Sequence, residues 1–460
     1  MTRLFKLGLV SLPLLLMLSC NGGRIKPPDN YTELFDVEGK TEKTSASEHQ
    51  DTRVIPFDSI PKGVKEFGVR VSGNPVNIDI ASILKVKSKV TLSQIASSVR
   101  YRFITMPDTL HGKVGGKVIN ALSPECYVSN VYGLFFTNED GVVCDTIYKN
   151  EIEIGFHNDG YYYTNAESVV SGLGFHDDWL VYSIVNREDK KTLQYITNAS
   201  TREVSCVLEK DGLHSRNISI PFSNGEWAEL FMRDLRASEN MLAFFGRRAD
   251  TLSLFRSSVL APKIKAQSYA NPESDYAYWL NNELYIKQAY NDTVFKLKGK
   301  SVLQPVYVLN MGEKKATVEQ CFIGNAEGKI LVDSWVETSK GAFIALTKGR
   351  DYPNARRDGL VKFLYAFYLK AGNRMFSLDI PETTVPEDVF IPNDIDGGCP
   401  INLSSLISDD GSYNQVYSYK GLKRLVSFST FGSLPKSNQD FLLDILSKMK
   451  PNQLFVVSVQ

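Results

Sequence analysis

The chain contains 460 residues, and its 52 basic side chains balance its 52 acidic side chains. This zero formal net charge gives no indication of a nucleic-acid partner, which a strongly basic chain would indicate. Aromatic residues make up 11% of the chain, a composition that favours β-structure. The length would allow two or three average domains, although propellers and barrels of this size form single units.

The first twenty residues have the pattern of an export signal. Arg3 and Lys6 precede the apolar run LGLVSLPLLLML, which is too short to span a bilayer comfortably. Ser19 and Cys20 follow directly, and this arrangement resembles the lipobox of bacterial lipoproteins, in which the cysteine is acylated. We therefore predict that residues 1–20 are a lipoprotein signal and that lipid on Cys20 anchors the protein in the cell envelope, at the outer membrane. A plain secretory signal with an incidental cysteine is the alternative.

The rest of the chain is expected to fall into three parts. Residues 21–53 are polar and lack apolar periodicity, so they are predicted to form a flexible tether. Residues 54–91 form an N-terminal extension, in which 69–83 alternates like a short strand pair. Residues 92–460 are expected to form the folded body.

Five cysteines follow the predicted lipid site, so at least one is unpaired or pairs between chains. No CxxC pair occurs among them. Buried free thiols are the favoured interpretation, because a chain of this length does not need disulfides for stability. The five are Cys126, Cys144, Cys206, Cys321 and Cys399.

The folded body begins with a short helical turn and a strand. Thr91 or Ser93 is placed to cap the turn, and VRYRFI at 99–104 alternates as a strand does. Strands then follow almost without helix. They are expected in two meanders, at 127–136, 141–148 and 151–156, and at 160–165, 179–185 and 193–196, and then at 204–208, 229–235, 241–245, 251–256, 302–309, 328–336, 341–346 and 360–369.

The clearest strand pair lies at 276–297, YAYWLNNELYIKQAYNDTVFKL. Asn281-Asn282 is a two-residue turn signal, because asparagine tolerates positive φ. An Asp292-Thr293 corner then opens a third strand, and similar corners stand at Asp145-Thr146 and Asp250-Thr251. Their spacing is compatible with a repeat of about 40 to 55 residues, which is the length of a propeller blade.

The C-terminal part combines strands with one amphipathic helix. Segments 416–419 and 424–431 are expected to form a hairpin. Apolar residues recur at helical spacing over 438–449, NQDFLLDILSKM, which predicts a helix that Pro451 ends. LFVVSV at 454–459 is expected to form a final strand.

Three motifs taken together resemble a known family. They are LSQIASSVRYRFI at 92–104, YNDTVFKL at 290–297 and NDIDGG at 393–398, in a chain that also has the lipobox and tether. This chain resembles the six-bladed β-propeller lipoproteins of Bacteroidetes, relatives of the NHL-repeat propellers. The resemblance implies an all-β fold, a six-bladed propeller of four-stranded antiparallel blades over 92–460 with a short C-terminal helix. It implies no cofactor and no defined catalytic residues. The chain departs from the family by lacking its Gly-rich loop after the first strand.

Two acidic patterns are candidates for metal binding. GFHND at 155–159 and GFHDD at 174–178 bring two histidines and several carboxylates, but separate hairpin loops need not converge. NDIDGG at 393–398 resembles the start of a calcium loop without its later ligands, since Leu403 stands where a glutamate is needed. Turns are therefore the favoured interpretation, and no metal site is assigned. Asp394 and Asp396 remain candidate ligand contacts.

A basic loop at 348–359, KGRDYPNARRDG, is the other candidate binding element. Long loops on rigid scaffolds commonly carry binding residues. Its Arg350, Arg356 and Arg357 could hold a carboxylate or sulfate in fork geometry, with Tyr352 beside them. A solvated loop, partly neutralised by its own aspartates, is the alternative.

These features favour a binding or scaffold module over an enzyme. The sequence contains no Gly-x-Ser-x-Gly elbow, zinc-protease helix motif, phosphate loop or dinucleotide fingerprint. The expected partners are the membrane, through the N-terminal lipid, and an extracytoplasmic ligand such as a glycan, peptide or envelope protein, with no nucleic acid. A propeller-type hydrolase or lyase acting on polysaccharide is the alternative.

Overall fold

The structure is a computed structural model that describes residues 54–56, 63–83, 87–107, 117–119, 121–123, 125–130, 133–149, 153–157, 160–164, 168–186, 191–211, 218–231, 240–259, 275–323, 326–348, 363–379, 389–402, 407–409 and 412–460. The chain divides into two compact units, one of 1–51 with 151–166 and one of 52–150 with 167–460. In the smaller unit, β11 (Glu153–His157) and β12 (Gly160–Thr164) form an antiparallel hairpin. The expectation that 151–156 joins the first meander is therefore wrong. Two strands separated by two residues close a shorter loop by pairing with each other.

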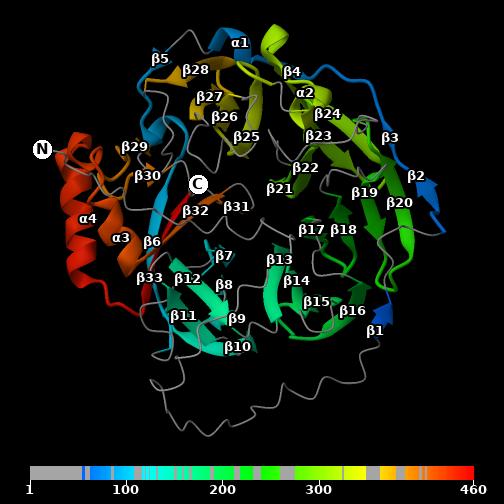
Figure 1. Cartoon of the computed structure of the whole chain (residues 1–460), viewed down its shortest axis with the longest axis horizontal. Helices are drawn as coiled ribbons and strands as arrows, with labels where there is room; N and C mark the ends of the chain where they lie inside the picture. The colour runs from blue at the N-terminus through cyan, green and yellow to red at the C-terminus, as the bar shows by residue number, and fades with distance from the viewer. Residues whose placement is uncertain are drawn as a thin grey trace, which may run out of the picture. The chain divides into compact units, whose positions relative to one another are not determined.

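The larger unit is a six-bladed β-propeller, which confirms the predicted all-β fold (Figure 1). Blades 1 to 3 each contain four consecutive antiparallel strands. Blade 1 holds β7 (Lys117–Ile119), β8 (Cys126–Asn130), β9 (Gly133–Thr137) and β10 (Val143–Lys149). Blade 2 holds β13 (Ser168–His176), β14 (Trp179–Asn186), β15 (Lys191–Asn198) and β16 (Val204–Asp211). Blade 3 holds β17 (Ile218–Pro221), β18 (Trp227–Leu230), β19 (Asn240–Phe245) and β20 (Thr251–Arg256).

Blades 4 and 5 repeat this plan, and blade 6 closes the ring. Blade 4 holds β21 (Tyr276–Leu280), β22 (Glu283–Lys287), β23 (Thr293–Lys298) and β24 (Val302–Asn310). Blade 5 holds β25 (Ile330–Glu337), β26 (Gly341–Lys348), β27 (Phe363–Leu369) and β28 (Arg374–Leu378). Blade 6 joins β31 (Ile407–Asp409), β32 (Ser412–Ser418) and the C-terminal β33 (Gln453–Val459) to the N-terminal β6 (Val99–Thr105). A separate two-stranded sheet pairs β29 (Phe390–Ile391) with β30 (Ile401–Asn402).

The segment before β6 runs along the outer edges of four blades, and we call this segment the belt. The belt strands pair in parallel with the outermost strands of blades 2, 3, 4 and 5 in turn. Its elements are β1 (Val54–Pro56), β2 (Glu66–Phe67), β3 (Val69–Arg70), β4 (Val76–Asp79), α1 (Ile80–Ile83) and β5 (Lys87–Ser88). The strand pair expected at 69–83 is therefore wrong, because β3 and β4 pair with β24 rather than with each other.

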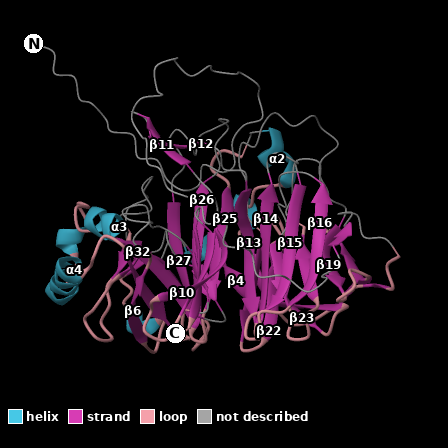
Figure 2. Ribbon diagram, turned by 90° about the horizontal axis from the view of Figure 1, so that it is seen from below, coloured by secondary structure: helices cyan, strands magenta, loops and turns pink. Residues whose placement is uncertain are grey.

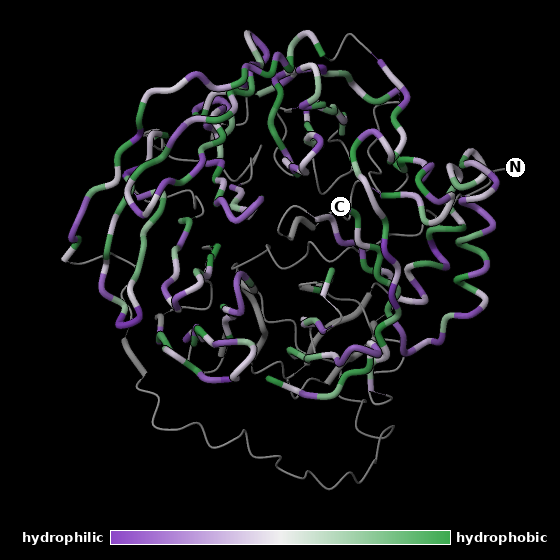
Figure 3. The backbone as a smooth tube through the Cα atoms, turned by 180° about the vertical axis from the view of Figure 1, so that it is seen from behind, coloured by the Kyte–Doolittle hydropathy of each residue, from purple (hydrophilic) through white to green (hydrophobic). Residues whose placement is uncertain are grey.

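Helices are few and short among the described residues. Besides α1, they are η2 (Leu92–Gln94), η4 (Gly312–Lys314), α2 (Val318–Ile323), α3 (Tyr419–Leu425), η7 (Phe431–Ser433) and α4 (Lys436–Lys448). Figure 2 shows α3 and α4 together beside the strands, and Figure 3 shows hydrophobic and hydrophilic residues alternating around α4. The predicted C-terminal helix is thus confirmed. Within the described part of the chain, no helix is long and apolar enough to cross a membrane.

The strand expected at 424–431 is also wrong, because this segment holds the end of α3 followed by turns that lead into η7. Ser418 ends β32 and its Oγ accepts a hydrogen bond from the Gly421 backbone N–H at 3.0 Å, which caps α3. Leu422 and Leu425 then lie one helical turn apart and are both buried in the core. The next strand of blade 6 is β33, which follows α4.

The hydrophobic core lies between neighbouring blades. In β21, Tyr278 and Leu280 belong to a cluster with blade 5, whereas Ala277 and Trp279 pack on a cluster with blade 3. This alternation follows from the two-residue period of a strand. Each blade therefore buries both faces only when its neighbours are present.

Candidate functional site

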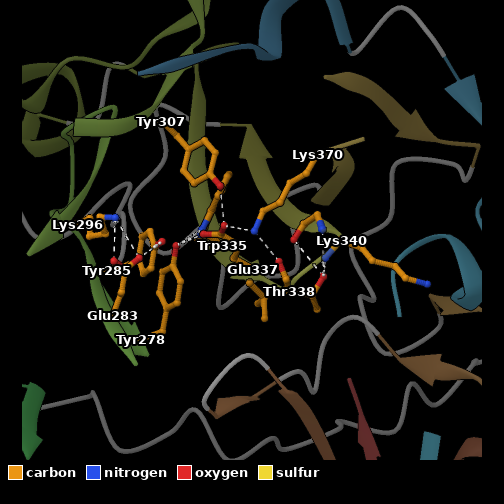
Figure 4. Close-up of polar contacts among 12 residues, drawn as sticks. Tyr278, Glu283, Tyr285, Lys296, Tyr307, Trp335, Glu337, Thr338, Lys340 and Lys370 are labelled. Atoms are coloured by element: carbon orange, nitrogen blue, oxygen red, sulfur yellow. Dashed lines mark hydrogen bonds and ion pairs between the residues drawn. The ribbon is translucent and has the colours of Figure 1, made fainter. Parts of the chain in front are cut away.

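A buried acidic group with three polar partners lies between blades 4 and 5. Glu337 ends β25, and only 1% of it is exposed. Its Oε2 accepts a hydrogen bond from the Tyr278 hydroxyl at 2.6 Å, and its Oε1 accepts one from the Tyr307 hydroxyl at 2.6 Å. The Lys370 Nζ lies 2.6 Å from the same Oε1 (Figure 4). We call Glu337, Tyr278, Tyr307, Lys370 and Trp335 the Glu337 cluster.

The strands of both blades hold these side chains in place. Trp335, two residues before Glu337 on β25, donates its indole N–H to the Tyr278 hydroxyl at 2.8 Å. Lys370 follows β27 and also donates to the Thr338 carbonyl at 2.7 Å. Tyr278 and Tyr307 come from the inner and outer strands of blade 4. The cluster therefore joins the two blades by charge-assisted hydrogen bonds.

The electrostatics of the cluster keep its phenols protonated. Burial, followed by the negative charge of Glu337, raises the pKa of Tyr278 well above its ordinary value. The same two causes raise the pKa of Tyr307. Both hydroxyls are thus hydrogen-bond donors to the carboxylate at neutral pH rather than proton acceptors. Chemically, the arrangement holds a buried negative charge and fixes two blades against each other.

A second polar network joins β6 to the segment before β30, and we call it the closure latch. The Tyr101 hydroxyl donates to Asp396 Oδ1 at 3.0 Å and accepts from Asn393 Nδ2 at 2.9 Å and from the Cys399 backbone N–H at 3.1 Å. The fully buried Asn438 of α4 donates to the carbonyls of Asn393 and Gly398 at 2.9 and 2.8 Å. Burial, followed by the charge of Asp396, raises the pKa of Tyr101.

Asp394 holds the helical turn that precedes β6. Its carboxylate accepts hydrogen bonds from the Ser93 backbone N–H at 2.8 Å and from the Ser93 hydroxyl at 2.7 Å. Burial acts to raise the pKa of Asp394, but the hydrogen bonds from Ser93 outweigh it and the net shift is downward. Thr91 is the N-cap of this turn, as predicted, and its N–H donates to the Gln94 side chain.

The structure thus brings together two of the predicted site residues. Asp394 and Asp396 lie in one loop, and their carboxylates bond to other parts of the same chain. Gly397 in this loop has a φ of 71°, which suits the turn that its sequence suggests. The other predicted positions, Cys20, Arg350, Tyr352, Arg356 and Arg357, lie outside the described residues.

The histidine of the GFHDD pattern at 174–178 is packed against an aromatic ring. The His176 ring stacks on Trp279 with centroids 3.5 Å apart, and its Nε2 lies 3.4 Å from the Asp177 carboxylate. The side chain of His157 lies outside the described residues. In the described stretches, no group of three or more His, Cys, Asp or Glu side chains is placed to hold a metal ion. The five cysteines after Cys20 are thiols rather than disulfides, and all but the exposed Cys144 are buried.

Sequence reasoning missed the Glu337 cluster. Glu337 closes an apolar strand just before a polar turn, a position where glutamates are ordinarily solvated. Its partners come from positions 278, 307 and 370, so local spacing carries no sign of the cluster. The one available signal is a set of tyrosines and a tryptophan at inward positions of β21, β24 and β25.

The fold is similar to that of a known structure from Bacteroides fragilis. A Bacteroides fragilis protein described as exported is 12% identical, with a TM-score of 0.51, over 84% of this chain and 100% of that one. A member of the DUF4221 family from Bacteroides vulgatus is 8% identical, with a TM-score of 0.41, over 80% of this chain and 97% of that one. No curated protein matches the sequence significantly. A family profile matches residues 61–427, which is most of the chain and most of the propeller. The chain therefore belongs to the family described as domain of unknown function DUF4933.

Proposed function

We propose that this protein is an envelope lipoprotein whose propeller binds an extracytoplasmic ligand without catalysing a reaction on it. The observation that carries the proposal is the construction of the ring. Segments far apart in sequence are joined by polar contacts, which are buried at the Glu337 cluster and partly exposed at the closure latch. A ring held in this way is a rigid scaffold on which loops can present a binding surface.

The chemistry of the Glu337 cluster supports binding over catalysis. A general base must come within hydrogen-bond reach of the proton that it abstracts from a substrate. Glu337 is buried and bonded to two tyrosine hydroxyls, and these tyrosines have raised pKa values that keep them protonated. The ligand classes that we propose are a glycan, a peptide or an envelope protein. The proposed contacts are Arg350, Tyr352, Arg356 and Arg357 of the basic loop, with Asp394 and Asp396.

A paired binding and turnover screen tests this function. The chain from residue 21 to 460, which lacks the signal and the lipid site, is applied to a glycan array and incubated with the same polysaccharides. Retention without product supports the proposal, whereas release of oligosaccharides establishes the hydrolase or lyase alternative. Arg356→Ala/Arg357→Ala should abolish retention, since it removes two fork-shaped donors. The control is Lys314→Ala/Lys423→Ala, which changes two exposed basic residues elsewhere.

The envelope location rests on the signal pattern and is supported by the similarity to a protein described as exported. We propose that acyl chains on Cys20 anchor the protein at the outer membrane. Labelled palmitate should be incorporated by the parent chain and lost in Cys20→Ser. Incorporation that survives this substitution would rule out Cys20 as the lipid site.

A further inference from the structure

The belt displays an apolar stripe on the outer rim of the propeller. Five large hydrophobic side chains are exposed among the described residues, and three of them lie at alternate belt positions. They are Phe67, Val69 and Val71, which are 55%, 53% and 39% exposed. We call these three residues the rim stripe. Alternate residues of an extended segment share one face, so the three side chains project together.

The backbone beneath the stripe is fixed to blades 3 and 4. The Gly68 N–H donates to the Leu254 carbonyl at 2.9 Å, and the Val69 N–H donates to the Ser301 carbonyl at 2.8 Å. The Val71 N–H donates to the Leu303 carbonyl at 3.0 Å. The stripe is therefore a feature of an ordered edge. Exposed apolar side chains that are held in one row mark an interaction surface more often than they occur by accident.

Basic side chains lie beside the stripe. The Arg256 guanidinium lies 5.6 Å from the centroid of the Phe67 ring. Arg70 alternates with the two valines and so projects to the opposite face, where its guanidinium donates to the Arg256 carbonyl at 2.6 Å. Lys298 pairs across β23 and β24 with Val302, which in turn pairs with Val69, so it lies about 10 Å from the stripe. The exposed acidic groups on this belt segment and its neighbouring turn are Glu66 and Asp250, and Asp250 is paired with Lys65. The surroundings of the stripe are therefore cationic.

We propose that the rim stripe docks on an anionic lipid surface, with its three side chains at the acyl boundary and the exposed Arg256 and Lys298 at the headgroups. Apolar side chains flanked by basic residues are the composition that binds such surfaces. A stable protein partner would need about 800 Å² on each side, more than three side chains supply. The belt begins at Val54, so the stripe is near the end of the chain that enters the propeller. This inference rests on the proposed anchoring at Cys20, which would hold the propeller close to a lipid surface on which the stripe could dock.

Vesicle sedimentation tests the proposal without the lipid anchor. Residues 21–460 should sediment with vesicles of phosphatidylglycerol and phosphatidylcholine, and much less with phosphatidylcholine alone. The variant Phe67→Ser/Val69→Ser/Val71→Ser should bind about tenfold or more weakly, and Arg256→Gln/Lys298→Gln should lose the preference for anionic vesicles. Val142→Ser/Leu443→Ser removes the two exposed hydrophobic side chains outside the stripe and should bind as the parent does.

A depth measurement keeps the test decisive if the triple variant is unstable. In Phe67→Trp, the new indole should be quenched by brominated acyl chains, whereas in Leu443→Trp it should not. Equal sedimentation of parent and folded triple variant, or no quenching in Phe67→Trp, would overturn the proposal. The proposal would also be overturned if the triple variant still bound vesicles but no longer bound an envelope protein that the parent binds. Palmitate labelling reports on Cys20 separately, so either idea can fail alone.

Discussion

At the scale of single residues, Glu337 shows how a carboxylate can be buried at a blade junction. Burying an unpaired charge costs several kcal/mol even after relaxation. Here the Tyr278 and Tyr307 hydroxyls and the Lys370 ammonium all lie 2.6 Å from carboxylate oxygens. Three charge-assisted contacts can offset that cost only while all the donors are present. The junction between blades 4 and 5 should therefore be sensitive to the loss of one hydroxyl.

Tyr307→Phe tests this sensitivity. The substitution keeps the ring and removes one donor from a buried carboxylate, so the free energy of unfolding should fall by about 1.5–3 kcal/mol. Urea unfolding measures the change. Tyr285→Phe is the matched control, because the Tyr285 hydroxyl makes a longer bond of 3.3 Å to Glu283, which is much more exposed. An equal loss in the two variants would contradict the role of the cluster.

The raised tyrosine pKa values predict instability in alkali. Folding raises the pKa of Tyr278 and Tyr307 above the ordinary value of 10.0, so the folded state holds these protons more tightly. Their contribution is complete below pH 10 and is lost as the pH rises from there toward the folded-state pKa. Each such tyrosine should steepen the fall in unfolding free energy by about 1.4 kcal/mol per pH unit.

Urea titrations between pH 9 and pH 11 should therefore show a shallower fall for Tyr278→Phe/Tyr307→Phe than for the parent. Other tyrosines, including the half-buried Tyr101 and the buried Tyr413, also have raised pKa values, so the double variant should still lose stability above pH 10. Identical slopes would show that the two phenols do not titrate with unfolding.

At the scale of elements, the belt depends on one glycine. Gly68 stands where the chain passes from the edge of blade 3 to the edge of blade 4. A Cβ at this position would collide with the buried ring of Phe255. Gly68→Ala should therefore lower the free energy of unfolding by about 1–3 kcal/mol, as overpacking does.

Protease digestion together with urea unfolding locates the effect, since a displaced belt should be cut near residue 68. Gly432→Ala is the control, because nothing lies within 4 Å of its added Cβ and its φ is not in the left-handed region. If Gly68→Ala unfolded like the parent, Phe255 would have to be free to move aside.

Local turn chemistry made some elements predictable. Asn281 and Asn282 have φ values of 53° and 58°, and they join β21 to β22 as their sequence predicts. The Asp-Thr corners were less informative than expected. Asp292-Thr293 opens the third strand of blade 4, Asp250-Thr251 opens the fourth strand of blade 3, and Asp145-Thr146 lies inside β10. An aspartate bends the chain at any turn, so these corners do not mark equivalent points of the blades.

The belt could not be predicted from the sequence, for a different physical reason. Strands β2, β3 and β5 contain two residues each, too few to show a period of two. Their partners lie far along the chain, as when Glu66 pairs with Ser253. The alternation seen at 69–83 was real, but the pairing that it suggested was local. Parallel pairing with a blade edge depends on residues far away along the chain, and the short-range sequence pattern does not encode it.

At the scale of the whole molecule, the ring is closed by strands from opposite ends of the chain. β6 pairs antiparallel with β33 over seven residue pairs, from Val99 with Val459 to Thr105 with Gln453. The closure latch adds the hydrogen bond from Tyr101 of β6 to Asp396 of the loop before β30. The belt lies outside this closure and adds only short parallel pairs. The two contributions should therefore separate in truncation experiments.

A chain of residues 89–460 lacks the belt strands but keeps β6, and a chain of 107–460 lacks both. The first should fold to an all-β structure that unfolds in one transition at a lower temperature than 54–460. The second should lose cooperative unfolding. Without β6, the edge of β33 is unpaired, and an incomplete blade 6 no longer covers the neighbouring face of blade 5. Circular dichroism melts, followed in the far and near ultraviolet, measure both changes. If 107–460 melted as cooperatively as 89–460 and at the same temperature, the pairing of β6 with β33 would not be what closes the ring.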